Sequence, residues 1–146
     1  MFDLPISSVM DKKKVLTAPP ETMVSAAAKL MANRNVGAVM VVEHDRLVGI
    51  FTERDAVFRV MANGRDAGTT PLAEVMTKSP QTVGPEQPFG YALLLMHENG
   101  FRHVPVIKNG KPVGIISARN ALDPDLEEFE CEANRRRHFR ERMLKG

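Results

Sequence analysis

The sequence of 146 residues contains no tryptophan, one tyrosine and one cysteine. The single cysteine, Cys131, cannot form an internal disulfide, which is typical of proteins in a reducing compartment. No apolar run approaches the roughly 18 residues that a membrane-spanning helix requires, and the longest lies at residues 36–42. The N-terminus also lacks the apolar centre of a secretory signal peptide. We therefore expect a cytoplasmic protein with no membrane span.

Motifs for metal binding and catalysis are also missing. The histidines do not lie at metal-ligand spacing from a second His or Cys; they are His44, His97, His103 and His138. Neither G-x-x-x-x-G-K-[S/T] nor G-x-G-x-x-G occurs, and no nucleophile-and-base pattern surrounds His103. We therefore expect no catalytic residue, no metal site and no enzymatic turnover. The net charge of +2 is too small to indicate nucleic acid as a general partner.

What the sequence does contain is an internal duplication. Thirteen of the 41 positions in residues 17–57 are identical in residues 82–122, at an offset of 65. Roughly two or three identities would be expected by chance at ordinary residue frequencies. The chain is therefore a tandem repeat, and both copies are expected to fold alike.

Each copy carries the pattern of a β-α-β-β-α unit. A short extended piece around Thr17 or Thr82 precedes a helix, at about 21–33 or 86–98, whose apolar residues recur on one side. The runs "VGAVMVV" and "HVPVI" predict buried strands, and "HDR" and "NGK" predict hairpin turns into the strands "LVGI" and "PVGII". A second helix is predicted to begin near residue 53 or 118.

These elements predict an α/β (α+β) fold of two units in tandem. The predicted boundaries are 1–62 for the first unit, 63–70 for a linker, 71–122 for the second unit and 123–146 for a C-terminal helix. A sheet of about three short strands with two helices cannot bury both of its faces alone. We therefore expect the units to pack through their sheets about a pseudo-two-fold axis.

The units close on two related stretches, "GIFTERD" at 49–55 and "GIISARN" at 114–120. Thr52 and Asp55 are spaced as in a capping box, in which each side chain bonds the backbone N–H of the other residue. A carboxylate can also accept hydrogen bonds from a ribose diol, and a helix start can hold phosphate. Both interpretations stay open, with Thr52 expected to cap while Asp55 points outward. Asn120 is neutral, so the first-unit ribose site is predicted to be the better one.

These features resemble a tandem pair of CBS domains, a Bateman module, of the stand-alone bacterial type. The resemblance covers residues 5–122 and is carried by the doubled V-M, the paired helix starts, "FRHVPVI" and G-I-x-[T/S]-x-x-[D/N]. It implies a regulatory module that binds an adenosine-containing ligand between the units. AMP, ADP, ATP, NAD(H) and S-adenosylmethionine are the candidates. It also implies a homodimer that senses energy or redox state and signals to an effector protein not identified by the sequence.

The resemblance also implies a set of ligand-contacting residues. Those of the first unit are Thr17, Ala18, Pro19, Val36, Gly37, Ala38, Thr52, Arg54 and Asp55. Those of the second unit are Thr82, Val83, Phe101, Arg102, His103, Val104, Ser117, Arg119 and Asn120. The alternatives are ordinary core for the strand residues, a solvated loop for Arg102 and His103, and cover of apolar surface by Arg54 and Arg119.

The tail suggests a function of another class. Basic residues crowd its last turns, namely Arg135, Arg136, Arg137, Arg140, Arg142 and Lys145. They follow an acidic first half, an order that suits the helix dipole. A solvated helix is one interpretation, and a nucleic-acid-associated adaptor that uses this basic helix is the other.

Overall fold

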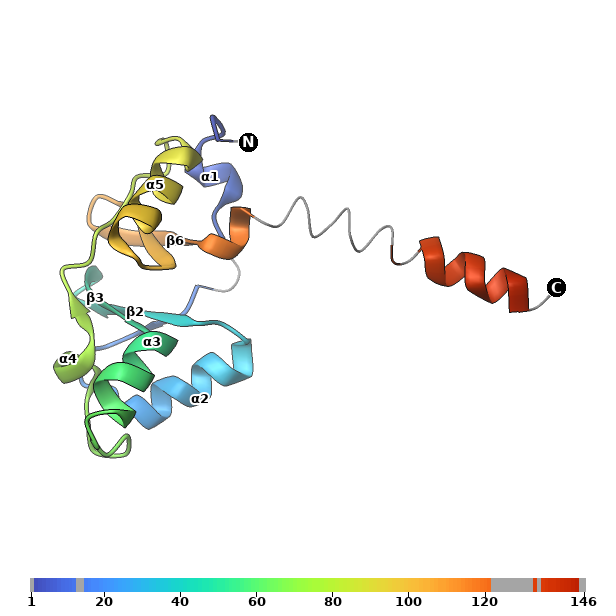
Figure 1. Cartoon of the computed structure of the whole chain (residues 1–146). Helices are drawn as coiled ribbons and strands as arrows, with labels where there is room; N and C mark the ends of the chain where they lie inside the picture. The colour runs from blue at the N-terminus through green and yellow to red at the C-terminus, as the bar shows by residue number, and fades with distance from the viewer. Residues whose placement is uncertain (1, 13–14, 122–132, 134, 145–146) are drawn as a thin grey trace.

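A computed structural model of the chain describes residues 2–12, 15–121, 133 and 135–144. The first half contains α1 (Ile6–Val9), β1 (Thr17–Ala18), α2 (Val24–Arg34), β2 (Ala38–Glu43), β3 (Arg46–Thr52), α3 (Glu53–Asp55) and η1 (Ala56–Met61) (Figure 1). The second half contains α4 (Leu72–Val75), β4 (Thr77–Lys78), α5 (Phe89–Asn99), β5 (His103–Lys108), β6 (Lys111–Ser117) and η2 (Ala118–Ala121). Residues 135–144 are helical, whereas the predicted acidic half of that helix, with Cys131, lies outside the described residues.

The two hairpins repeat each other in register, which confirms the duplicated fold. Ala38 pairs with Thr52 at the open end of the β2–β3 hairpin, and His103 pairs with Ser117 at the equivalent position of β5–β6. Both hairpins change register at the same place, after Val41 or Val106. The long helices end alike too, because the residue after α2 and the residue after α5 both have the left-handed conformation that terminates a helix.

The second helix of each unit is where the copies diverge. Its predicted start is confirmed at Glu53, where α3 makes one α-helical turn before continuing as the π-helix η1. The bond from Ala62 N–H to the Val57 carbonyl spans five residues, as a π-helix requires. In the second unit, the described residues after Ser117 form only a 3₁₀ turn, Ala118–Ala121.

The opening helix of each unit packs on the core of the other unit. Leu72 and Val75 of α4 belong to the hydrophobic cluster of the first unit, and β4 pairs with β3. Conversely, Ile6 of α1 is fully buried in the cluster of the second unit, and Asp11 pairs with Ile115 of β6. Each core is therefore completed by a segment that belongs to the other half of the sequence.

The sheets of the two units face each other across the middle of the molecule, as predicted. Figure 1 shows β2 and β3 opposite β6, with α2 and α3 on one outer side and α5 and α1 on the other. The Leu47 N–H donates to the carbonyl of Gly110, which ties the two hairpins together. In the part of the chain that the structure describes, no helix is long and apolar enough to cross a membrane.

Candidate ligand site

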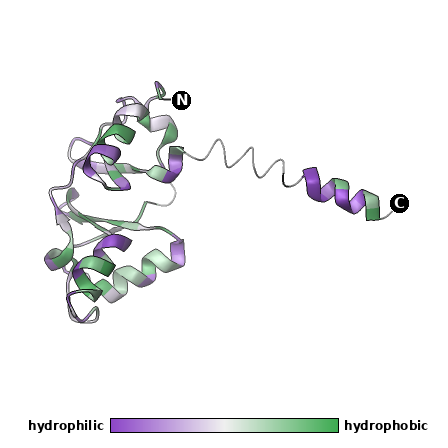
Figure 2. Ribbon diagram, in the orientation of Figure 1, coloured by the Kyte–Doolittle hydropathy of each residue, from purple (hydrophilic) through white to green (hydrophobic). Residues whose placement is uncertain are grey.

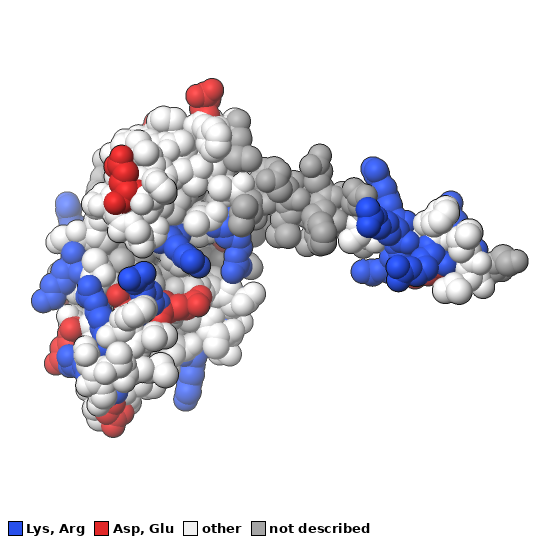
Figure 3. All heavy atoms as spheres, in the orientation of Figure 1, with Lys and Arg blue, Asp and Glu red and all other residues white. Residues whose placement is uncertain are grey.

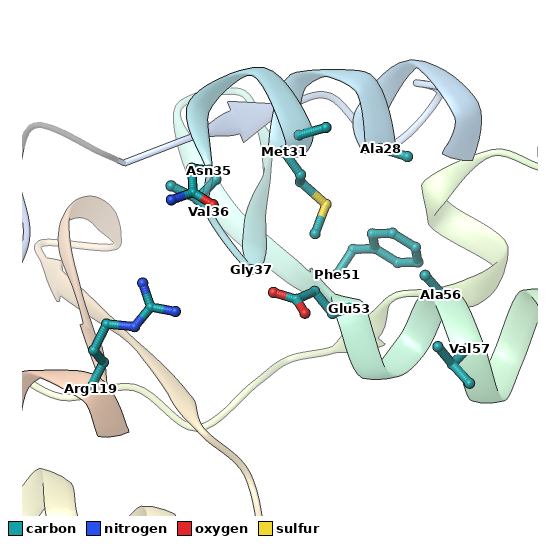
Figure 4. Close-up of a pocket in the computed structure, with 11 residues that line it drawn as sticks. Ala28, Met31, Asn35, Val36, Gly37, Phe51, Glu53, Ala56, Val57 and Arg119 are labelled. Atoms are coloured by element: carbon teal, nitrogen blue, oxygen red, sulfur yellow. The ribbon is translucent and has the colours of Figure 1, made fainter.

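A pocket of about 410 Å³ lies beside the junction of the two units. Helices α2 and η1 form its walls, Phe51 of β3 lies between them, and the loop before β2 forms one end (Figure 4). Its lining residues are Ala28, Met31, Ala32, Asn35, Val36, Gly37, Phe51, Glu53, Ala56, Val57 and Arg119. Arg119 comes from the second unit, and all the others come from the first. The pocket therefore receives residues from both copies of the repeat.

Charge enters this largely apolar pocket through two side chains. Figure 4 shows Glu53 at the start of α3 and, across the pocket, Arg119 reaching in from the second unit. The Glu53 backbone is fixed to the loop before β2, because its N–H donates to the Gly37 carbonyl at 3.0 Å. Figure 3 shows basic and acidic atoms side by side where the two units meet on this face. A ligand here would meet apolar walls and one charge of each sign.

Gly37 lines the pocket and lies close to His103 of the second unit. A Cβ atom at this position would fall 3.3 Å from Cε1 of His103 in the second unit and would clash with the Glu53 carboxylate. Burial lowers the pKa of His103, and Arg119 and Arg102 act in the same direction while Glu53 opposes them. Protonation of His103 is therefore disfavoured at this junction, chiefly by burial.

Thr52 and Asp55 form the capping box that their spacing indicates. The Thr52 hydroxyl accepts from the Asp55 N–H at 3.3 Å, and Asp55 Oδ2 accepts from the Thr52 N–H at 3.0 Å. Our expectation that Asp55 points outward is wrong, because this side chain turns back to close the cap and the residue is only 8% exposed. Its second oxygen, Oδ1, lies 3.5 Å from Nε of Arg59. Both carboxylate oxygens therefore already have partners.

Asn120 makes the corresponding cap in the second unit. Its amide oxygen accepts from the Ser117 N–H at 2.7 Å and from the Ser117 hydroxyl at 3.2 Å. Its amide nitrogen donates to the carbonyl of Val9, the last residue of α1, at 3.3 Å. The neutral residue thus keeps the cap and also reaches the exchanged helix directly.

The predicted ligand residues do not all come together. Val36, Gly37 and Arg119 line the pocket, and His103 lies beside Gly37. Ala18, Ala38, Val83 and Val104 are buried core residues, and Phe101 packs against the core of the second unit. Thr17 and Pro19 are exposed on and after β1, Thr82 is half-buried, and Arg102 is exposed. Arg54 stacks on the Phe58 ring at 4.9 Å. The ligand contacts of these residues stay predictions.

Sequence reasoning missed most of the pocket wall. Ala28 and Met31 of α2 fall on the one-sided apolar stripe that the sequence predicts for this helix, and α2 does bury Met31; nothing in the sequence singled out Ala32. Glu53 was the residue most open to prediction, because it lies between Thr52 and Asp55 in the closing motif. The feature that could have indicated Glu53 as a pocket residue is its position in the first turn of α3, next to the loop before β2.

A duplicated α/β unit with a pocket shared between its copies defines a ligand-binding module. Comparison with known protein families agrees, since the CBS domain matches residues 6–62 and residues 72–125. The chain therefore belongs to the CBS-domain family and carries two such domains in tandem.

Individual relatives include proteins of similar length and longer ones. The CBS domain-containing protein YhcV of Bacillus subtilis is 38% identical over 114 residues, which cover 77% of this chain and 81% of YhcV. The chain spans only 23% of a longer relative, CBSCBSPB1 of Arabidopsis thaliana, with 33% identity over 123 residues.

Solved structures share the fold. An uncharacterised conserved protein from Pyrococcus horikoshii superposes with a TM-score of 0.79 at 32% identity, over 86% of this chain and 94% of the other. The CBS domain protein PAE2072 from Pyrobaculum aerophilum, solved in complex with AMP, gives a TM-score of 0.73 at 26% identity, over 80% and 89%.

Proposed function

We propose that this chain is a regulatory module that binds an adenosine-containing ligand, AMP, ADP, ATP or NAD(H), where its two units meet. The observation that carries the proposal is the pocket, whose 410 Å³ falls in the usual range for small-molecule sites. Its apolar walls suit the faces of an adenine ring, and Arg119 suits a phosphate. The AMP complex of PAE2072 supports this ligand class.

Binding is proposed to act through the relative position of the two units. A ligand that touches both units has a different affinity for each arrangement of them, so it shifts their population. An effector protein would then respond to the favoured arrangement. Small-angle X-ray scattering with and without saturating AMP, together with pull-down of candidate effectors, measures this response. If AMP binds but neither shape nor effector affinity changes, the chain is a binding protein and not a sensor.

The proposed sensor is a homodimer. Three large apolar side chains on η1 are exposed, with Val57 at 50%, Phe58 at 59% and Met61 at 72% of their surface in solvent. Figure 2 shows η1 as a hydrophobic stretch on the outer side of the first unit. Adjacent exposed apolar side chains of this kind are typical of interaction surfaces. Native mass spectrometry of the purified protein measures subunit number, ligand mass and ligand count together.

Asp55 and Asn120 provide the test of where the ribose binds. We expect Asp55→Ala to abolish most AMP binding by calorimetry, while Asn120→Ala retains it, because the Asp55 carboxylate can still accept from the ribose through Oδ1, whereas the one amide oxygen of Asn120 already accepts two hydrogen bonds. Asp55→Asn is the sharper variant, since Asn120 shows that an amide can hold the same cap. Equal losses in the Asp55 and Asn120 variants, at equal thermal stability, would contradict the asymmetry.

We propose binding without turnover. Nucleotide recovered after prolonged incubation with the protein should be unchanged when it is separated by chromatography. A product that appears in proportion to protein concentration, and that disappears in Arg119→Ala, would instead make the chain an enzyme.

A second candidate function rests on the tail. Residues 135–144 are helical and contain five arginines and one glutamate, which gives a formal charge of +5 − 1 = +4. Figure 3 shows the resulting basic surface. A nucleic-acid-associated adaptor would bind DNA or RNA with a steep salt dependence, and truncation after residue 134 would remove that binding. DNA or RNA binding that persists after this truncation would show that the tail is not the nucleic-acid-binding site.

A further inference from the structure

Arg59 connects the Asp55 cap to the segment that the first unit receives from the second. Its guanidinium lies 3.5 Å from Asp55 Oδ1 through Nε. The same guanidinium donates from a terminal nitrogen to the Met76 carbonyl at 3.0 Å and to the Val75 carbonyl at 3.4 Å. These are the carbonyls at the C-terminal end of α4, where a cation is favoured by the helix dipole. One side chain therefore contacts both the cap and the exchanged helix.

The second unit makes the same connection with different chemistry. Val9 is the equivalent of Val75, because each is the last residue of its exchanged helix. Here Asn120 reaches the Val9 carbonyl with its own amide, with no intervening residue. In the first unit the Asp55 carboxylate has no hydrogen to donate, and the α4 carbonyls of Val75 and Met76 can only accept. A hydrogen-bond donor must therefore lie between them, and the Arg59 guanidinium supplies it. The second unit thus has Asn120 at the position of Asp55 and keeps the cap. Its connection from the cap to the exchanged helix is shorter and uncharged.

We propose that Arg59 is a positioning residue that couples the Asp55 cap to α4 and β4. The coupling to ligand rests on the function proposed above. A ribose that hydrogen-bonds to Asp55 must share Oδ1 with Arg59, because Oδ2 is already bonded to Thr52. Ligand at the first-unit cap therefore alters the hold on α4, whereas the Asn120 link of the second unit is neutral and direct.

This proposal is tested first without ligand, by hydrogen exchange of the Thr77 amide of β4 and of the nearby Ser79 amide, both of which face β3. We expect Arg59→Met to speed their exchange about tenfold, since bonds from a charged donor to two carbonyls are lost. Arg65→Met is the matched control, because Arg65 pairs with Glu74 of α4 without touching Asp55. The Asp11–Ile115 bridge in the second unit should be unchanged and reports on global opening.

Three results would overturn the Arg59 link. They are unchanged exchange at Thr77 and Ser79, an equal effect of Arg65→Met, and an equal effect at the Asp11–Ile115 bridge. Arg59→Lys separates charge from geometry, because a lysine can contact one partner but not span both. We expect it to restore only part of the protection.

The ligand arm uses AMP as the probe. AMP at saturation should change exchange at Thr77 and Ser79 in the unaltered protein and leave it unchanged in Arg59→Met. If AMP binds by calorimetry and produces no such change, the coupling is wrong although the proposed function stands. If calorimetry detects no AMP binding, the proposed function fails for AMP, and the ligand-free comparison alone decides whether Arg59 holds α4.

Discussion

Gly49 makes the sharpest test of how the two units are joined. It lies on β3, directly under the segment that follows α4, and its pairing partners are Val41 and Lys78. A Cβ atom at this position would fall 2.9 Å from Cγ of Met76, closer still to its sulfur, and 3.0 Å from the Thr77 carbonyl oxygen. The methionine side chain can rotate away, but the backbone oxygen is held by the β3–β4 pairing. Gly49→Ala therefore forces the two strands apart.

The sign of this effect separates two explanations of the glycine. Gly49 is not among the glycines with positive φ, so its backbone accepts alanine without strain. If nothing lay above it, Gly49→Ala would raise the free energy of unfolding by about 0.4–1 kcal/mol, because alanine restricts the unfolded chain. Overpacking against a fixed backbone costs about 1–3 kcal/mol instead. We expect a net loss, measured by equilibrium urea unfolding.

Gly114 supplies the matched comparison. A Cβ atom there would meet Met10 at 2.5 Å from Sδ and 3.0 Å from Cγ, but the nearest backbone oxygen, that of Asp11, is 3.3 Å away. Gly114→Ala should therefore destabilise less than Gly49→Ala. A double-mutant cycle that combines Gly49→Ala with Met76→Ala should show a favourable coupling energy, so that the double variant loses less stability than the sum of the two single variants. The reason is that removal of the Met76 side chain leaves only the Thr77 carbonyl in the way of the new methyl group. A Gly49→Ala protein as stable as the parent would refute the reasoning.

Three further predictions concern the junction and the dimer. The pKa of His103 in the folded protein lies below the ordinary 6.5. The unfolded chain therefore binds more protons than the folded protein as the pH falls through 6.5, and the free energy of unfolding decreases there. In urea unfolding between about pH 7.5 and 5.5, His103→Gln should make this decrease smaller. Gly37→Ala should weaken AMP binding in calorimetry, because its methyl group displaces the Glu53 carboxylate at the pocket; unchanged affinity would place the ligand elsewhere. Phe58→Ser should shift native mass spectra to monomer, and an undiminished dimer would move the interface away from η1.

The duplication explains how much of the fold could be predicted. Positions that match at an offset of 65 adopt matching structures, so the hairpins and the long helices followed from the repeat. The assignment of the opening helices could not follow in this way. Ile6 and Leu72 are both apolar residues at equivalent places, and either would fill either core. Because the cores are copies of one another, nothing in the local sequence distinguishes packing on the parent unit from packing on its neighbour.

The site was predicted less completely, for two physical reasons. A capping box and a ribose-binding carboxylate require the same residues at the same spacing, so the sequence could not fix the side-chain direction of Asp55. The pocket wall of α2 is built from small apolar residues such as Ala28 and Ala32, which serve equally well as helix surface. Arg119 was identified through the repeat, but its place at a pocket formed mainly by the other unit depends on how the two sheets face each other.

The exchange of the opening helices has a consequence for the history of the chain. A gene that encoded one unit alone would produce a protein whose core lacks the side chains of α1 or α4. Two such molecules could complete each other by trading those helices, as domain-swapped dimers do. Joining the two genes through a segment such as residues 63–70 would turn that pairing into an intramolecular one. Once joined, the copies can diverge, as Asp55 and Asn120 have, but neither copy can be discarded without exposing the interior of the other.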